Sequence, residues 1–221
     1  MRILAAADLH GVPAVYEWLA RLTRTGVDTL VLAGDLLASD FPEEQRKTAR
    51  QMVALLKAGA VPVLYIMGND DNVALEYEDA ALIPIHGRRV EVAGYNFVGY
   101  QFTPPFVGDA FVKPDDEIAI DLEDIESLVD EKTVLVTHTR AWGHLDLSFG
   151  ENAGSRAVAA LLERKPALAH IHGHIHHRFG RDGNHFNVAC AGVCRAMLIE
   201  LPSLAHSVVA YRGNLIASGP F

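Results

Sequence analysis

Short apolar runs alternate with amphipathic segments over the first 70 residues, and this alternation constrains the fold more than any other feature. A continuous apolar run is typical of a strand that is buried on both faces, whereas apolar residues with a helical period predict a helix. An alternation of strands and helices indicates an α/β fold with a parallel sheet and right-handed crossovers. The predicted strands are 3–7, 29–33 and 62–67, and the predicted helices are 13–25 and 42–57.

The remainder of the chain is less regular. We predict two short strands around Gly94 within 88–98, a long loop over 101–113 and a solvated helix within 115–131. A strand at 133–137, a helix at 153–164 and a strand at 167–171 follow. Alternating segments at 184–189, 192–200 and 206–212 predict an antiparallel meander. A chain of 221 residues fits one domain, which we predict to span 1–221.

Polar residues follow five of the predicted strands directly. Ligands of α/β sheets bind outside the carboxyl ends of the strands, so we expect these five blocks to converge at one edge of a sheet. The blocks are Asp8-Leu9-His10-Gly11, Gly34-Asp35, Gly68-Asn69-Asp70, Thr137-His138 and Gly173-His174-Ile175-His176.

The donors in these blocks suit a pair of metal ions. Two dications about 4 Å apart repel each other by roughly 17 kcal/mol at an effective dielectric constant near 20, so an anionic group must lie between them. Asp35 is the expected bridge, because its carboxylate can give one oxygen to each ion. The other donors divide between the two ions, with Asp8, His10 and His176 on one and Asn69, His138 and His174 on the other.

The kind of donor indicates the kind of metal and the chemistry. Oxygen and imidazole donors without a thiolate favour Mn, Fe, Zn, Ni or Co over Ca or Mg, whose sites are dominated by oxygen. Two carboxylates do not neutralise two dications, so the cluster stays cationic and attracts a phosphate. The ions would also lower the pKa of a bridging water and supply hydroxide for in-line attack at phosphorus.

The ordered set Asp-x-His, Gly-Asp, Gly-Asn, His and Gly-His-x-His resembles that of the calcineurin-like metallophosphoesterase superfamily, over roughly residues 1–200. The resemblance implies an α/β/β/α sandwich of two mixed sheets, two divalent transition metal ions, most often Mn²⁺, and hydrolysis of phosphomonoesters or phosphodiesters. It implies a first metal site of Asp8, His10, Asp35 and His176 and a second of Asp35, Asn69, His138 and His174.

One position departs from this pattern. Many members of the superfamily have a histidine where this chain has Asp70, and that histidine contacts the phosphate and helps to protonate the leaving group. A carboxylate beside two metal ions has a lowered pKa and is a poor general acid. We therefore expect a phosphodiesterase for leaving groups that need little protonation; a phosphomonoesterase and a non-catalytic scaffold are the alternatives. The predicted catalytic residues are Asp35, Asn69, Asp70 and His138.

Several residues near the blocks have weaker assignments. His144 is a candidate replacement acid, Arg140 and Arg178 are candidate phosphate clamps, and His170 and His172 are candidates for hydrogen bonds that support the ligands. Each is also compatible with an ordinary surface or packing role. Trp142 and the Pro104-Pro105-Phe106 loop could wall a pocket or serve in packing. Cys190 and Cys194 are interpreted as buried strand residues, with a redox or metal-binding pair as the alternative, and His177 and His185 have no assigned role.

The net charge of -9 argues against a broad basic face for nucleic acid, so the expected partner is a small phosphoester. No uncharged apolar run approaches the ~18 residues that a membrane span needs, and the first apolar run is too short for a signal sequence. We therefore expect a cytoplasmic protein without membrane contact. Whether it forms a homo-oligomer stays open.

Overall fold

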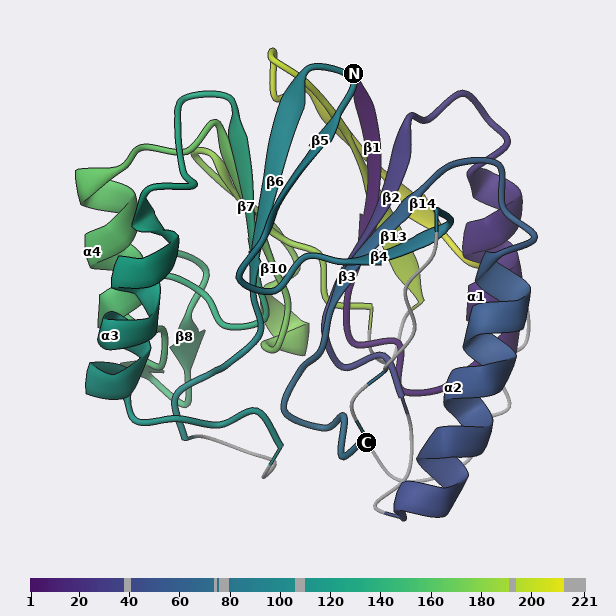
Figure 1. Cartoon of the computed structure of the whole chain (residues 1–221), viewed down its shortest axis with the longest axis horizontal. Helices are drawn as coiled ribbons and strands as arrows, with labels where there is room; N and C mark the ends of the chain where they lie inside the picture. The colour runs from purple at the N-terminus through teal and green to yellow at the C-terminus, as the bar shows by residue number, and fades with distance from the viewer. Residues whose placement is uncertain (38–40, 74, 76–79, 106–109, 191–193, 213–221) are drawn as a thin grey trace.

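The computed structural model describes residues 1–37, 41–73, 75, 80–105, 110–190 and 194–212. In this part of the chain two six-stranded sheets lie face to face (Figure 1). The first sheet has the order β14-β13-β1-β2-β3-β4 and the second the order β11-β12-β10-β7-β6-β5. The strands of the first sheet are β1 (Arg2–Ala6), β2 (Thr29–Ala33), β3 (Val63–Ile66), β4 (Leu82–Pro84), β13 (Arg195–Glu200) and β14 (His206–Ala210). Those of the second are β5 (Arg89–Val92), β6 (Tyr95–Tyr100), β7 (Thr133–Thr137), β10 (Ala169–His172), β11 (Gly180–Asp182) and β12 (His185–Asn187).

Both sheets are mixed. In the first, β1 to β4 are parallel, β13 pairs antiparallel with β1, and β14 pairs antiparallel with β13. In the second, β12, β10, β7 and β6 are parallel, and β11 and β5 are antiparallel edge strands. A short hairpin, β8 (Leu147–Ser148) and β9 (Glu151–Asn152), lies outside both sheets.

Two pairs of helices cover the outer faces of the sandwich (Figure 1). α1 (Pro13–Leu22) and α2 (Pro42–Leu56) pack on the first sheet, and α3 (Asp115–Glu126) and α4 (Arg156–Arg164) pack on the second. The α/β/β/α sandwich of mixed sheets predicted for this chain is confirmed. No helix among the described residues is both long enough and apolar enough to cross a membrane.

The strands carry continuous apolar runs because both of their faces are buried. Along β1, Leu4 faces the helices, whereas Ile3 and Ala5 face the second sheet. Along β7, Leu135 packs under α3 and α4, whereas Val134 packs between the sheets. The period of two in a strand thus divides neighbouring residues between an outer and a central apolar layer.

The predicted antiparallel meander near the C-terminus is confirmed only for its last two segments, because β13 and β14 pair antiparallel but β12 does not join them. β12 pairs parallel with β10 in the second sheet, whereas β13 pairs antiparallel with β1 in the first. The alternation of these segments was informative about burial but not about pairing, because Phe186 and Met197 face the same central core from opposite sheets. The chain crosses between the sheets near Ala189, which forms an isolated bridge with Ala7.

Other predictions have mixed outcomes. The helices and strands of the first 70 residues and the two strands around Gly94 are confirmed, but β4, β8, β9 and β11 were not predicted. Cys190 and Cys194 are buried and free, as expected, but neither lies in a strand. Phe106 lies outside the described residues, and a single domain over 1–221 stays a prediction.

Candidate metal centre

The predicted metal ligands follow the carboxyl ends of five strands. β1, β2 and β3 carry three of the polar blocks, and β7 and β10 carry the other two. These strands belong to two sheets, so the expectation that the blocks meet at one edge of a single sheet is wrong. The site lies where the ends of both sheets come together.

Backbone hydrogen bonds hold the loops after β1 and β2 side by side. The backbone N–H groups of Asp8 and His10 donate to the carbonyls of Gly34 and Asp35, at 2.9 and 3.1 Å. Asp8, His10, Asp35 and His174 all have positive φ, at 57°, 44°, 51° and 71°. Such a conformation costs a residue with a side chain about 1–2 kcal/mol. Four predicted ligands are therefore held in strained conformations by the surrounding structure, a common property of functional sites.

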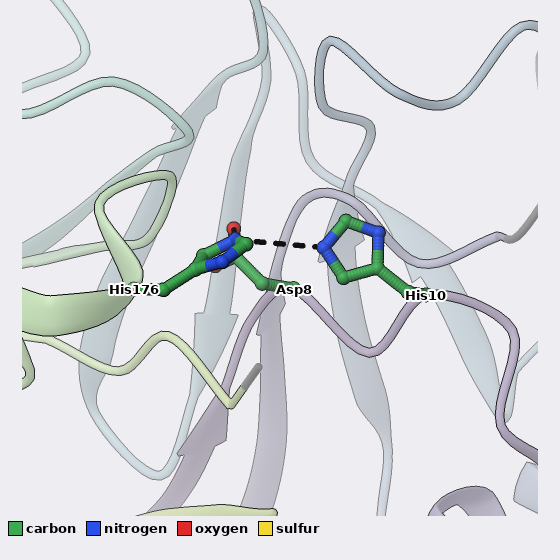
Figure 2. Close-up of side chains that lie close together, drawn as sticks. All are labelled: Asp8, His10 and His176. Carbon is green, nitrogen blue, oxygen red and sulfur yellow. Dashed lines mark hydrogen bonds and ion pairs between the residues drawn. The ribbon is translucent and has the colours of Figure 1, made fainter. Parts of the chain in front are cut away.

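The first group of donors consists of Asp8, His10 and His176 (Figure 2). Nε2 of His176 lies 3.0 Å from Oδ1 of Asp8 and 3.5 Å from Nε2 of His10. Both Asp8 oxygens also accept from the backbone N–H of His174, at 3.1 and 3.0 Å, which ties the end of β1 to the end of β10. Two imidazoles and a carboxylate thus point at one place, as a metal site requires.

The second group consists of Asp35, His138 and His174. Nδ1 of His138 donates to the carbonyl oxygen of Ala33 at 2.8 Å, which leaves the lone pair of a neutral ring on Nε2. That Nε2 lies 3.2 Å from Oδ2 of Asp35 and 3.0 Å from Oδ1 of Asn69. When the ring is neutral, three electron-pair donors therefore converge, and a cation between them relieves their mutual repulsion. The residues fit a metal ion.

The ionisable groups of the chain itself favour a positive charge between Asp35 and His138. Burial lowers the pKa of His138, but the charge and hydrogen bond of Asp35 outweigh burial and raise that pKa to about 9. In turn, burial acts to raise the pKa of Asp35, but His138 outweighs it and holds that pKa well below its usual range. Burial and the neighbouring His138 lower the pKa of His174, which keeps this ring neutral and able to ligate.

Three groups of potential ligands occur among the described residues, and Asp35 belongs to two of them: the group with His138 and His174, and a group with His10 and Asp70. Its Oδ2 faces His138, and its Oδ1 accepts from the backbone N–H of Asp70 at 2.9 Å. The two oxygens therefore point to different parts of the centre, which is the arrangement that a bridging carboxylate needs. The assignment of Asp35 as the bridge stays a prediction.

The side chain of Asp70 contacts two of the predicted ligands, Asn69 and His10. Its Oδ1 accepts from the side-chain amide of Asn69 at 2.8 Å, and its Oδ2 lies 3.8 Å from Nδ1 of His10. Burial, and then the charge of Asp35, raise the pKa of Asp70. The lowered pKa that we predicted for Asp70 therefore depends on the charge of the bound ions.

Two glycines allow the blocks to approach this closely. A Cβ on Gly68 would overlap Oδ1 of Asp35, and a Cβ on Gly173 would overlap Oδ2 of Asp8. Any larger residue would displace a carboxylate of the centre. Glycine at the first position of these two ligand blocks is thus required by close packing.

Asp71 is a residue that the sequence analysis missed. Its buried carboxylate accepts from the backbone N–H groups of Leu36, Leu37 and Gly68, at 3.2, 2.8 and 2.8 Å. Asp71 thus ties the loop that carries Asp35 to the loop that carries Asn69. Burial and then Asp35 raise the pKa of Asp71 to about 7. Its position at the end of the Gly68-Asn69-Asp70-Asp71 run was the only signal for it in the sequence.

The histidines around the site form a separate cluster. Nε2 of His170 lies 2.7 Å from Oγ1 of Thr137, and its Nδ1 lies 3.0 Å from Nδ1 of His185. The predicted hydrogen bond from His170 to a ligand side chain is therefore wrong, although Thr137 directly precedes His138. Nδ1 of His172 lies 3.5 Å from the carbonyl oxygen of Gly173. His144 stacks on His185 at 3.9 Å and pairs with Asp182 at 2.8 Å. The role of His144 as an acid stays a prediction.

We expect His185 to make the fold sensitive to acid. Burial, and then His144, lower its pKa from 6.5 to about 4. Between these values the unfolded chain binds more protons than the folded chain, so stability falls as the pH falls through this window. The groups that face His185 are His144, Asp182 and His170. Urea unfolding of the EDTA-treated protein across this pH window should show a weaker acid dependence in His185→Gln than in the wild type; equal slopes would contradict this assignment.

The other candidate residues lie near the site in different settings. Arg140 is fully buried and donates from Nη2 to the carbonyl of Ala153 at 2.9 Å, so the surface role considered for it is wrong. Arg178 donates from Nε to the carbonyl of Leu147 at 2.9 Å. The Arg156 guanidinium lies 3.6 Å from the ring centre of Trp142. The phosphate-clamp roles of Arg140 and Arg178 and the pocket role of Trp142 stay predictions.

Comparison with known proteins agrees with the geometry. The family model described as calcineurin-like phosphoesterase matches residues 1–178 of the chain. No curated protein matches it. The solved structure of TT1561 from Thermus thermophilus is 19% identical with a TM-score of 0.69, and the match covers 95% of this chain and 98% of that one. A structure described as a novel archaeal phosphodiesterase is 11% identical with a TM-score of 0.55, and the match covers 96% and 100% of the two chains. At these identities the structural similarity shows the fold alone.

Proposed function

The chain belongs to the calcineurin-like phosphoesterase family, and from this premise we propose that it is a phosphodiesterase that uses two divalent transition metal ions. The observation that carries the proposal is the convergence of three candidate ligand groups at the strand ends of both sheets. Asp8, His10 and His176 would hold one ion, Asn69, His138 and His174 the other, and Asp35 both. Mn²⁺ is the metal that we propose first, with Fe, Zn, Ni or Co as alternatives.

When bound, the ions supply Lewis-acid chemistry: they polarise phosphoryl oxygens and lower the pKa of water, so that hydroxide can attack phosphorus. The chain itself supplies orientation. The Ala33 carbonyl sets the tautomer of His138, and the backbone N–H of His174 orients Asp8. Asp70 orients the amide of Asn69 through the hydrogen bond between their side chains. These contacts hold the donors ready to bind, which is how the surroundings of a metal site raise its affinity.

The preference for diesters rests on Asp70. Its carboxylate accepts from Asn69 and lies near His10, so it acts as an acceptor that orients other residues. Cationic charge beside it favours the ionised form, which cannot donate a proton to a leaving group. Substrates with good leaving groups, such as aryl or cyclic phosphodiesters, would therefore react better than alkyl monoesters. A phosphomonoesterase remains the alternative.

A matched set of substrates tests this proposal. We expect the metal-loaded enzyme to hydrolyse bis(p-nitrophenyl) phosphate with a kcat/KM that exceeds that for an alkyl phosphate by about 10²-fold, the usual contribution of a general acid. The assay compares the aryl diester, p-nitrophenyl phosphate and glycerol phosphate with Mn²⁺, Zn²⁺, Ni²⁺ and Co²⁺ in turn. An alkyl monoester as the best substrate would overturn the proposed preference.

The proposal also covers the size of the substrate and the cellular location of the enzyme. The acidic chain, with a net charge of -9, favours a small phosphoester over a long nucleic acid as its substrate. We also propose a cytoplasmic location, and we assign no oligomeric state. Sedimentation and cell fractionation would test these two points.

A further inference from the structure

The hairpin of β8 and β9 ends in an unusual turn. Leu147 pairs with Asn152 and Ser148 with Glu151, so Phe149 and Gly150 form a loop of two residues. Their φ angles are both positive, at 50° and 88°, as a type I′ turn requires. Asparagine or aspartate followed by glycine is the preferred sequence for such a turn, because most side chains resist positive φ.

Neither local conformation nor packing accounts for phenylalanine at this position. Phe149 is 98% exposed, the highest value among the exposed large hydrophobic residues of the described chain. A bulky residue at positive φ is an outlier, and an aromatic ring exposed to water gains nothing from burial. Strained residues persist where a function needs them, so this residue is a candidate for contact with a ligand.

The base of the hairpin is held firmly. Asp146 is buried, and its Oδ2 accepts from the backbone N–H groups of Gly143 and Gly154, at 3.1 and 3.0 Å. The backbone N–H of Ala153 donates to the carbonyl of Asp146 at 3.0 Å. These hydrogen bonds link the two ends of the hairpin through Asp146 and so fix the position of its base.

The hairpin is joined to the segment that carries a predicted metal ligand. The carbonyl oxygen of Leu147 lies 3.2 Å from Nε2 of His177 and accepts from Nε of Arg178 at 2.9 Å. Both partners belong to the short helix η1 (His176–Arg178), which begins at the predicted ligand His176. β8 lies in the lower half of Figure 1, the half toward which β1 runs from the N-terminus. The hairpin is therefore hydrogen-bonded to the segment that carries His176.

We propose that Phe149 is a specificity-determining residue that stacks on an aromatic group of the substrate while the phosphodiester lies at the metal centre. This inference rests on the proposed function and adds a substrate class to it: phosphodiesters with an aromatic substituent, such as a nucleobase. A cationic side chain is also present in this segment: Arg178, which suits an anionic phosphate, follows the predicted ligand His176 by two residues and is hydrogen-bonded to Leu147 of the hairpin. An exposed aromatic ring binds bases by stacking with little dependence on their sequence.

Two esters with the same leaving group provide the test. Thymidine 5′-(p-nitrophenyl phosphate) retains a base after cleavage, whereas methyl p-nitrophenyl phosphate retains only a methyl group. We expect Phe149→Asn to lower kcat/KM for the thymidine ester about tenfold, the stacking contribution of one base, and to leave the methyl ester nearly unchanged. Phe149→Tyr keeps a ring and should retain the preference. Val208→Ser, at an exposed apolar residue of β14, is the matched control.

Because asparagine suits the turn, Phe149→Asn is expected to fold with at least wild-type stability, which urea unfolding checks. An equal fall for both esters would assign Phe149 a structural role and overturn the inference. Unchanged kinetics together with a changed sedimentation coefficient would assign it to an interface and would also overturn it.

A binding measurement separates this inference from the proposed function. If the wild type cleaves neither ester, the proposed function fails, and fluorescence of Phe149→Trp then decides the inference. Quenching by thymidine 5′-monophosphate in the presence of Mn²⁺, but not by inorganic phosphate, would support an aromatic subsite. Absence of quenching by the nucleotide would overturn it.

Discussion

Replacement of Asp35 by asparagine is expected to lower kcat/KM for an aryl phosphodiester by about 10³-fold or more. The variant keeps the shape of the side chain but removes the negative charge that offsets the repulsion of two ions. A loss of about 4 kcal/mol of charge stabilisation corresponds to this factor at 1.36 kcal/mol per tenfold change in rate. The charge of Asp35 is also what raises the pKa of His138 to about 9, so the variant loses the attraction for positive charge at this place.

Two measurements check this result. The metal bound per chain, determined by mass spectrometry after dialysis, should fall together with hydrolysis. Asp116→Asn makes the same chemical change at an exposed position in the first turn of α3, and it should leave both quantities unchanged. Full metal content and activity in Asp35→Asn would remove Asp35 from the centre.

Replacement of Asp71 by alanine is expected to lower the free energy of unfolding by about 3–5 kcal/mol. The substitution leaves the buried backbone N–H groups of Leu36, Leu37 and Gly68 without their acceptor. Activity should fall as well, because a displacement of about 1 Å at a catalytic centre can cost 10²-fold in rate. The loops that carry Asp35 and Asn69 would no longer be tied together.

Graded variants distinguish this role from a general loss of stability. Asp71→Asn keeps one oxygen and should be intermediate between alanine and the wild type in urea unfolding. Asn72→Ala changes the exposed neighbouring residue and should have a small effect. A decrease of less than about 1 kcal/mol in Asp71→Ala would show that its three hydrogen bonds contribute little.

Whether a sequence-based prediction was correct depended on how far apart in the chain the interacting residues lie. The strands and helices of the first 70 residues follow from local apolar periods, and the structure contains them. The segments at the C-terminus were assigned to one meander, because alternation reports burial and not the partner strand. Asp71 was missed because a carboxylate that accepts three backbone hydrogen bonds has no periodic or compositional signal.

The amino-acid sequence by itself determined the α/β class, the order of the polar blocks after the strands and the chemical types of the donors. These are local properties, set by residue identity and by spacing along the chain. Only the tertiary structure decided that five strand ends from two sheets meet, that His138 points Nε2 at Asp35, and that the side chain of Phe149 is exposed. Such features arise from contacts between segments far apart in the chain, for which the residues of either segment alone carry no signal.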